Sequence, residues 1–234
     1  MLQKEKLIYS RFDFQSNFLF DGLTPREENR VKSYFETMYF SKGNKLFYED
    51  GIPTGVFLIE EGKAKKYKSL VDGQHQIFYI YTSGELLGYH ALLSDERYHD
   101  SCEALEDITT KFIHKEAFFK LMEEIPTLKN SIIKNMAHEF GVLANTIAIL
   151  AQKAQNVRLA LYLLVLENRF NKDTTSNQGI DLSRQDLANL IGATRESLGR
   201  SLKEFKEGKL IEVKSKVIYI LDKKGLLSYL EKEA

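Results

Sequence analysis

The sequence predicts an α+β protein with three successive parts: an N-terminal antiparallel β-roll, one long helix, and two short helices followed by a β-hairpin. Three observations support this fold class. Short β-rich runs broken by Gly and Asp fill the first half, apolar residues then recur at helical spacing, and two capped helical patterns flank a Gly-containing turn. We expect the parts to cover residues 1–125, 126–154 and 155–234.

The bulk composition indicates a folded chain whose two ends differ in charge. The 234 residues are 43% apolar and include only three prolines. The net charge is zero, yet residues 1–151 hold 18 basic and 22 acidic side chains, whereas residues 152–234 hold 15 and 11. A polyanion would therefore prefer the C-terminal third. No run has the length of a signal peptide or a membrane span, so we expect a soluble, cytoplasmic protein without a membrane partner.

The roll is predicted from the runs "VFLI", "KAKKYKSL" and "IFYIY", which are separated by turn residues at short spacing. Upstream, Thr24 and Pro25 followed by an acidic first turn predict the start of a helix. The single cysteine, Cys102, rules out an intrachain disulfide and an all-cysteine metal or iron–sulfur site. The roll also lacks the clustered His-x-His ligands that a metal-dependent enzyme on such a scaffold needs. We therefore predict neither a metal site nor an enzyme.

The long helix carries apolar residues at alternating spacings of three and four, which is a 3.5-residue repeat over three heptads. Such a repeat favours pairing with a second copy of the same helix, although packing within its own domain is the alternative. The predicted dimer seam is Ile133, Met136, Phe140, Leu143, Ile147 and Leu150.

The two short helices are predicted at "SRQDLANLI" and "TRESLGRSLKEF", with a polar loop, "NKDTTSNQG", before them. Ser183, with Asp186 three residues later, and Thr194 are expected N-caps, and Gly192 lies in the turn between the helices. Two short helices joined by a tight Gly-containing turn are typical of a DNA reader. The closing run "KLIEVKSKVIYIL" predicts a hairpin around Lys214, Ser215 and Lys216.

The second short helix places Arg195, Glu196, Gly199 and Arg200 on one side. Arginine donates two hydrogen bonds to guanine and glutamate accepts one from cytosine, so this face suits base-edge readout. Glu196 and Arg200, four residues apart, can instead pair with each other on a solvated face. The first short helix begins where side chains and backbone N–H groups can hold phosphates. The predicted DNA-binding set is Arg195, Glu196, Arg200, Ser183, Arg184, Gln185, Thr194 and Ser197.

The stretch "LSRQDLANLIGATRESLGRSLKEFKEGKLI" resembles the winged helix-turn-helix of the CRP/FNR family of bacterial transcription regulators. The resemblance extends over nearly the whole chain, including "GELLG" in the roll and the long helix. It implies a cyclic-nucleotide-binding-like roll, a dimerisation helix and a homodimer bound to double-stranded DNA. The matching Arg195, Glu196 and Arg200 imply a near-palindromic, TGTGA-like site, and RNA polymerase is a candidate further partner.

The effector pocket departs from the family pattern. In that family a Gly-Glu pair and a later Arg-Ser pair bind the cyclic nucleotide, with the arginine on the phosphate. This sequence keeps Gly84 and Glu85, but Asp100-Ser101 stands at the second pair, and a carboxylate would repel a phosphate. Arg97 is the alternative cation if the loop shifts. The adenine-contacting Thr-Ser pair falls at Leu143-Ala144, which carry no hydroxyl, so cAMP control is not expected.

The effector is therefore unknown from the sequence, and several alternatives stay open. Heme would need axial ligands, for which His90 and His99 are the candidate pair. Cys102 has no basic sequence neighbour that would activate its thiol for redox sensing. A ligand-binding roll that acts through protein contacts is the remaining alternative to a DNA-binding regulator.

Overall fold

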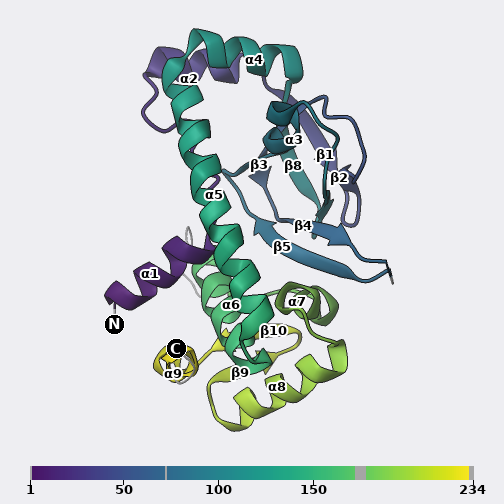
Figure 1. The fold of residues 1–234 in the computed structure, drawn as a ribbon, viewed down its shortest axis with the longest axis vertical. Helices are drawn as coiled ribbons and strands as arrows, with labels where there is room; N and C mark the ends of the chain where they lie inside the picture. The colour runs from purple at the N-terminus through teal and green to yellow at the C-terminus, as the bar shows by residue number, and fades with distance from the viewer. Residues whose placement is uncertain (1, 72, 172–177, 232–234) are drawn as a thin grey trace. The chain divides into compact units, whose positions relative to one another are not determined.

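The computed structural model of the chain describes residues 2–71, 73–171 and 178–231 (Figure 1). The chain divides into two compact units. One runs from Phe14 to Gly141; the other joins the segment that ends at Asp13 to the segment that begins at Val142. The chain therefore passes between the units twice, once after Asp13 and once within a helix.

The first unit is an antiparallel roll, as predicted from the short β-rich runs and the turn residues between them. Two four-stranded sheets have the orders β1-β8-β3-β6 and β2-β7-β4-β5, and every pairing in them is antiparallel. The strands are β1 (Glu36–Phe40), β2 (Lys45–Phe47), β3 (Gly55–Glu61), β4 (Ala64–Ser69), β5 (His75–Tyr81), β6 (Leu86–Leu87), β7 (Ser101–Ala104) and β8 (Ile108–His114). Three helices accompany them: α2 (Pro25–Lys32), α3 (Tyr89–Ser94) and α4 (Lys115–Glu124).

The helix predicted at Thr24 is confirmed as α2. Thr24 accepts a hydrogen bond from the backbone of Glu27, and the Glu27 carboxylate accepts one from the backbone of Thr24. This capping box satisfies two backbone donors at the helix start. The core of the unit packs α2 and α4 against the sheet and the first turns of the following helix, through residues such as Val31, Phe118 and Leu128.

The long helix is α5 (Pro126–Gln152), which agrees with the expected 126–154 to within two residues. The boundary between the units falls inside it, after Gly141. Ile133, Phe140 and Ile147, spaced seven residues apart, are 55%, 76% and 66% exposed. Met136, Leu143 and Leu150 between them are partly buried. The predicted seam therefore forms an apolar stripe in which Ile133, Phe140 and Ile147 face solvent.

The second unit contains the two short helices and the hairpin (Figure 1). Its C-terminal elements are α6 (Gln155–Phe170), α7 (Arg184–Ile191), α8 (Arg195–Glu207), β9 (Ile211–Lys214), β10 (Val217–Ile220) and α9 (Lys223–Glu231). The strands β9 and β10 form the expected antiparallel hairpin, with Ser215 in the left-handed conformation at its turn. Of the polar loop expected at 171–179, residues 172–177 lie outside the described residues.

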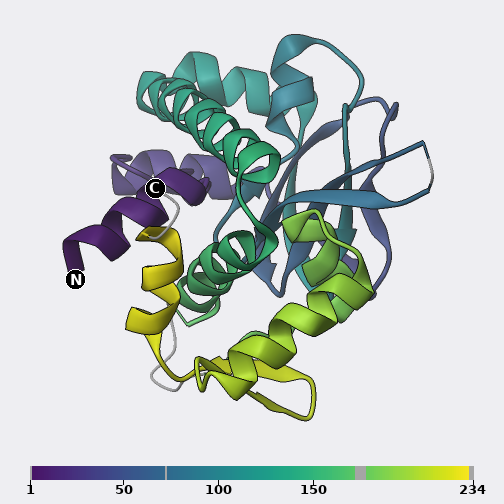
Figure 2. The same ribbon diagram turned by 60° about the horizontal axis from the view of Figure 1, so that its bottom comes forward.

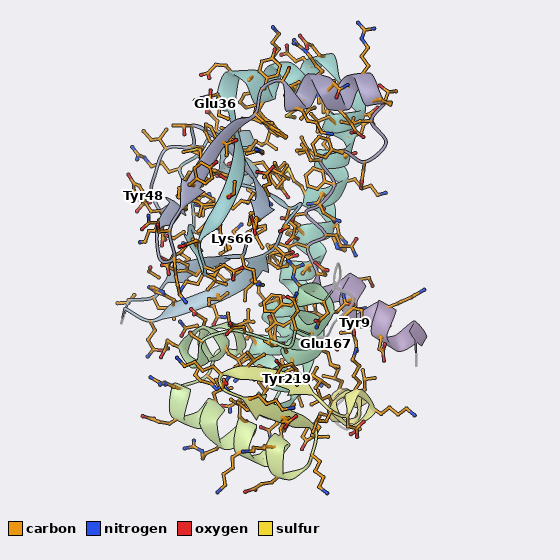
Figure 3. All side chains as sticks on the ribbon, turned by 180° about the vertical axis from the view of Figure 1, so that it is seen from behind. Tyr9, Glu36, Tyr48, Lys66, Glu167 and Tyr219 are labelled. Atoms are coloured by element: carbon orange, nitrogen blue, oxygen red, sulfur yellow. The ribbon has the colours of Figure 1, made fainter. Side chains whose placement is uncertain are left out.

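The N-terminal helix α1 (Leu2–Phe12) packs on α6, so the segment up to Asp13 groups with the second unit instead of with the roll. Asp13 and Arg169 form a buried ion pair. Tyr9 of α1 and Glu167 of α6 lie close together in Figure 3, and burial together with Glu5 and Glu167 raises the pKa of Tyr9 to about 12. No short-range pattern in the sequence indicated this pairing. Across the described helices, none is both long and apolar enough to cross a membrane.

Candidate nucleic-acid interface and roll cavity

The two short helices are capped as predicted. The hydroxyl of Ser183 accepts a hydrogen bond from the backbone N–H of Asp186 at 3.0 Å, and that of Thr194 accepts one from Ser197 at 3.1 Å. Gly192 ends α7 in the left-handed conformation (φ 61°), which favours glycine. Leu187 of α7 and Leu198 of α8 are fully buried, so the pair forms a compact helix-turn-helix. Figure 2 shows α8 (light green) beside the hairpin (yellow-green).

The charged residues of α8 lie on its solvent-facing side. Arg195, Glu196 and Arg200 are all exposed, whereas Leu198 and Phe205 on the other side are fully buried. Within the part of the chain that the structure describes, none of these three charged side chains has a hydrogen bond or an ion pair. The Glu196–Arg200 pairing, left open by the sequence, is therefore not formed.

Gly199 leaves the centre of this face open. A Cβ atom added to Gly199 would have no heavy atom within 4 Å outside its own helix backbone. Glycine in mid-helix costs about 1 kcal/mol relative to alanine. No contact among the described residues explains that cost, so the absence of a side chain at Gly199 leaves room for close approach by another molecule.

A shallow cavity of about 420 Å³ lies along α8 between the start of α7 and the hairpin. Its lining residues are Arg184, Arg195, Gly199, Leu202, Lys203, Lys206 and Val213. Burial lowers the pKa of Arg184, and the Nη1 atom of Arg184 is buried without a hydrogen-bond partner among the described residues. A cavity lined by four cations, one of them with an unused donor, has the chemistry of an anion site.

Sequence reasoning missed two of these cations. Arg195, Gly199, Lys203 and Lys206 follow one another at spacings of four, four and three residues, so they lie on one face of the helix. That spacing was the signal that could have found them. Other predicted contacts have internal partners: Ser197 donates to Gln155 at 2.6 Å, and Gln185 donates to Asn189 at 2.9 Å.

At the roll's Gly84-Glu85 turn, the polar groups are satisfied internally. Gly84 has a positive φ of 83°. The Glu85 carboxylate is buried and accepts hydrogen bonds from the Tyr79 hydroxyl at 2.9 Å and from the backbone N–H and hydroxyl of Thr82 at 2.7 and 3.1 Å. This pair therefore closes a turn at the sheet edge.

Asp100 and Ser101, which stand at the second pair of the family pattern, also have partners inside the roll. Asp100 forms an ion pair with Lys66 of β4 at 3.1 Å, and the Ser101 hydroxyl accepts a hydrogen bond from the backbone of Glu49 (Lys66 is labelled in Figure 3). Arg97, the alternative cation, donates to the Asp50 carbonyl at 2.6 Å. Leu143 and Ala144 lie on α5 beyond Gly141, in the other compact unit.

The cavity beside Asp100 is small. It measures about 30 Å³, which is room for about one or two water molecules. It is lined by Phe47, Lys66, Gly88, His90, Ala91, Tyr98, His99 and Asp100. The rings of Phe47 and Tyr98 stack at 4.1 Å and fill this side of the roll. His90 is bound to Glu139 at 2.7 Å and His99 to Glu96 at 2.8 Å, so both histidines proposed as heme ligands have carboxylate partners. Among the described residues, no group of three His, Cys, Asp or Glu side chains forms a metal site.

Cys102 is fully buried, and burial is the main reason that the pKa of its thiol is raised well above the usual value, with Asp100 adding to the effect. The thiolate is therefore disfavoured at neutral pH, which removes the reactivity that a redox switch needs.

Two family models match the chain, one for each unit. Residues 37–125 match the cyclic nucleotide-binding domain, and residues 157–229 match the Crp-like helix-turn-helix domain. Together they define a DNA-binding regulator with a roll of the cyclic-nucleotide-binding type.

Individual relatives agree with this class. The fumarate and nitrate reduction regulatory protein of Vibrio cholerae is 30% identical over 189 residues, covering 80% of this chain and 75% of the relative. The cyclic AMP receptor protein of Thermus thermophilus is 27% identical, covering 79% and 83%. The chain belongs to the CRP/FNR family of transcription regulators, and these relatives are regulators and not enzymes.

Solved structures share the fold at lower identity. FixK2 from Bradyrhizobium japonicum has a TM-score of 0.75 at 20% identity, covering 83% of this chain and 96% of that one. The regulator CLP of Xanthomonas campestris, described as responsive to c-di-GMP, has a TM-score of 0.74 at 17% identity, covering 85% and 100%.

Proposed function

We propose that this regulator is a homodimer that reads a near-palindromic, TGTGA-like site with α8 and that its roll does not take cAMP. In each half-site Arg195 and Arg200 would donate to guanines and Glu196 would accept from a cytosine. The observation that carries this proposal is the exposed, unpaired state of these three side chains around the open position at Gly199.

The cavity along α8 supports backbone contacts next to the base contacts. Arg184, Lys203 and Lys206 line it, and the buried Nη1 of Arg184 lacks a partner within the described chain. Phosphate oxygens are the anions that such a set binds on DNA, and these contacts fix register without reading sequence. We assign Arg184 to a phosphate contact on this ground.

The apolar stripe of α5 supports the homodimer. Ile133, Phe140 and Ile147 recur at heptad spacing and are more than half exposed. Exposed apolar residues in a heptad repeat are typical of a coiled-coil seam between two helices. A pair of α5 helices would set two copies of α8 about one DNA turn apart, roughly 34 Å, which matches a palindromic site.

The roll's cassette supports independence from cAMP. Lys66 already neutralises Asp100 at 3.1 Å, and Glu85 is engaged by Tyr79 and Thr82. A cyclic phosphate would have to break the Lys66–Asp100 pair and leave a carboxylate beside its own charge, which is unfavourable. The cavity beside Asp100, of about 30 Å³, is too small to admit a nucleotide at this position.

The experiment is DNA binding by base-contact variants. Replacement of Arg195 or Arg200 by Ala should weaken binding to an inverted TGTGA repeat by about 1–3 kcal/mol, roughly 5- to 150-fold, and relax selectivity at one base pair. Arg184→Ala should weaken binding to matched and mismatched duplexes alike and lower the salt slope by about one. Arg26→Ala, at an exposed arginine of α2 in the roll unit, is the matched control. Unchanged affinity and selectivity in both α8 variants would refute the proposal.

A further inference from the structure

Arg158, near the start of α6, joins two helix ends within the second unit. Its Nη1 donates to the carbonyl of Leu150 in the last turn of α5 at 2.9 Å. Its Nη2 donates to the carbonyl of Gly192, the residue that ends α7 and opens the turn to α8, at 3.2 Å. One guanidinium therefore bridges the C-terminal end of the long helix and the turn of the helix-turn-helix.

The chemistry of this bridge suits arginine. The last carbonyls of a helix have no intrahelical partner, and the C-terminal end of a helix carries partial negative charge, so a cation is favourable there. Arg158 satisfies two such carbonyls with a planar, fixed fork. Its Nε is buried without a hydrogen-bond partner in the described chain, so the two Nη atoms make the side-chain hydrogen bonds that the structure records for it.

The first turn of α6 also holds α8 directly. Gln155 accepts a hydrogen bond from the Ser197 hydroxyl and donates one to the Ser201 hydroxyl, both at 2.6 Å. Asn156 donates to Glu204 at 2.9 Å. The start of α6 and the buried side of α8 therefore form one hydrogen-bonded body. Arg158 connects that body to the end of α5.

We propose that Arg158 is a positioning residue that transmits the direction of α5 to the reading helix α8. This inference rests on the proposed function, because α5 would form the dimer and α8 would read the DNA. In such a dimer the tilt of α8 relative to α5 determines the separation of the two reading helices. Arg158 lies on α6, away from the exposed face of α8, and so acts on spacing without serving as a base contact.

The first test measures spacing preference. Inverted TGTGA repeats are prepared with half-site separations varied one base pair at a time around one helical turn, about 10 base pairs, together with a single half-site duplex. The variants are Arg158→Met, which loses both bonds, and Arg158→Lys, which keeps the charge and reaches one carbonyl. Lys224→Met is the matched control: Lys224 is exposed on α9 and has no ion pair among the described residues. Thermal unfolding confirms that each variant is folded.

Wild type and Lys224→Met should prefer one separation sharply. Arg158→Met should bind that separation about tenfold more weakly and bind the others more evenly, while its affinity for the single half-site stays within about twofold. Arg158→Lys should fall between. A wild-type preference retained in Arg158→Met would overturn the inference, as would an equal loss on every duplex including the half-site, which indicates damage to the reading face itself.

A second test needs neither DNA nor a dimer and so separates this inference from the proposed function. Spin labels at Ala148→Cys on α5 and Lys203→Cys on α8, both exposed positions, report the distance between the two helices within one chain. The distance distribution should be narrow in wild type and Lys224→Met and clearly broader in Arg158→Met. Equal widths would overturn the positioning role even if DNA binding is confirmed. A broadened distribution together with absent sequence-specific binding would retain the coupling and refute the DNA-reading proposal.

Discussion

Replacing Glu139 by Ala is predicted to destabilise the roll strongly, because this carboxylate joins three segments of the unit. Glu139 lies on α5 and is 1% exposed. Its Oε1 accepts hydrogen bonds from Ser16 at 2.7 Å, Tyr89 at 2.5 Å and Asn135 at 2.7 Å. Its Oε2 faces the Nε2 of His90 at 2.7 Å.

The magnitude follows from what the substitution leaves behind. Removing the acceptor of buried hydrogen-bond donors costs about 1–3 kcal/mol per donor, and removing one charge of a buried pair costs about 3–5 kcal/mol, so we expect a loss of about 3–5 kcal/mol. His90 is 33% exposed and can regain water, so its share is at the low end. The Ser16 and Tyr89 hydroxyls lose this acceptor and supply most of the rest, whereas Asn135 still donates to the Tyr89 hydroxyl at 2.8 Å. Glu139→Gln keeps one acceptor oxygen and should cost less, about 1–2 kcal/mol.

The assay is urea unfolding of the full chain, monitored by hydrogen exchange in peptides that come from the roll. Glu139→Ala should shift the transition that exposes the roll to lower urea, with Glu139→Gln between it and wild type. Glu123→Ala, an exposed glutamate on α4, controls for loss of a negative charge. If Glu139→Ala unfolds at the wild-type urea concentration, the buried cluster does not stabilise the roll and the reasoning fails.

The Glu139 carboxylate also determines how the stability of the roll changes with pH. Burial would raise the pKa of Glu139, but the hydrogen bond and charge of His90, followed by Tyr89 and Ser16, hold it below the usual value. The Tyr89 pKa is raised well above its usual value by burial and by Glu139, as is that of nearby Tyr81, so both phenols stay protonated. In the unfolded chain a glutamate has a pKa of about 4.3. Because the pKa of Glu139 is lower in the folded protein, its ionised carboxylate stabilises the fold at pH values above about 4.3. This stabilisation is lost as the pH falls through the folded-state pKa. Wild type should therefore lose more stability below about pH 4 than Glu139→Gln; parallel pH curves would contradict this.

Three further predictions concern other parts of the chain. Phe140→Glu, in the middle of the α5 stripe, should shift the protein from dimer to monomer in sedimentation experiments. Lys134→Glu on the same helix should leave the dimer intact. A dimeric Phe140→Glu variant would contradict the assignment of this stripe as the dimer seam. Asp13→Ala leaves Arg169 buried without this carboxylate and should lower the free energy of unfolding by about 3–5 kcal/mol. Hydrogen exchange should become faster in α6 and stay unchanged in the roll strands. Faster exchange in the roll alone would contradict the grouping of α1 with α6. Cys102 should resist a thiol reagent at neutral pH until urea unfolds the roll, and rapid labelling of the native protein would show that the thiol is accessible.

The elements that sequence predicted best are those whose signals are local. Ser183 and Thr194 cap their helices through backbone groups three residues away, and the α5 repeat is visible in one continuous run. The antiparallel strands β3, β4 and β5 also follow from short runs and turns. Such signals depend on a few neighbouring residues, so one sequence is sufficient to recognise them.

What the sequence did not predict depends on distant pairs. Ser16 and Glu139 are 123 residues apart, and Arg169 lies 156 residues from Asp13. The departure at Asp100 was evident from the sequence, but its neutralisation by Lys66 depends on the pairing of β4 with β7. The bridge made by Arg158 likewise joins two carbonyls that only the folded chain brings together.

The most direct test of the central claim is a footprint of the purified, ligand-free protein on genomic fragments, repeated with cAMP. We predict protection of inverted, TGTGA-like repeats without added ligand and the same pattern when cAMP is present. Protection that appears only with cAMP would contradict the assignment of the roll. Absence of sequence-specific protection under both conditions, or protection of unrelated sequences, would contradict the assignment of Arg195, Glu196 and Arg200 as base contacts.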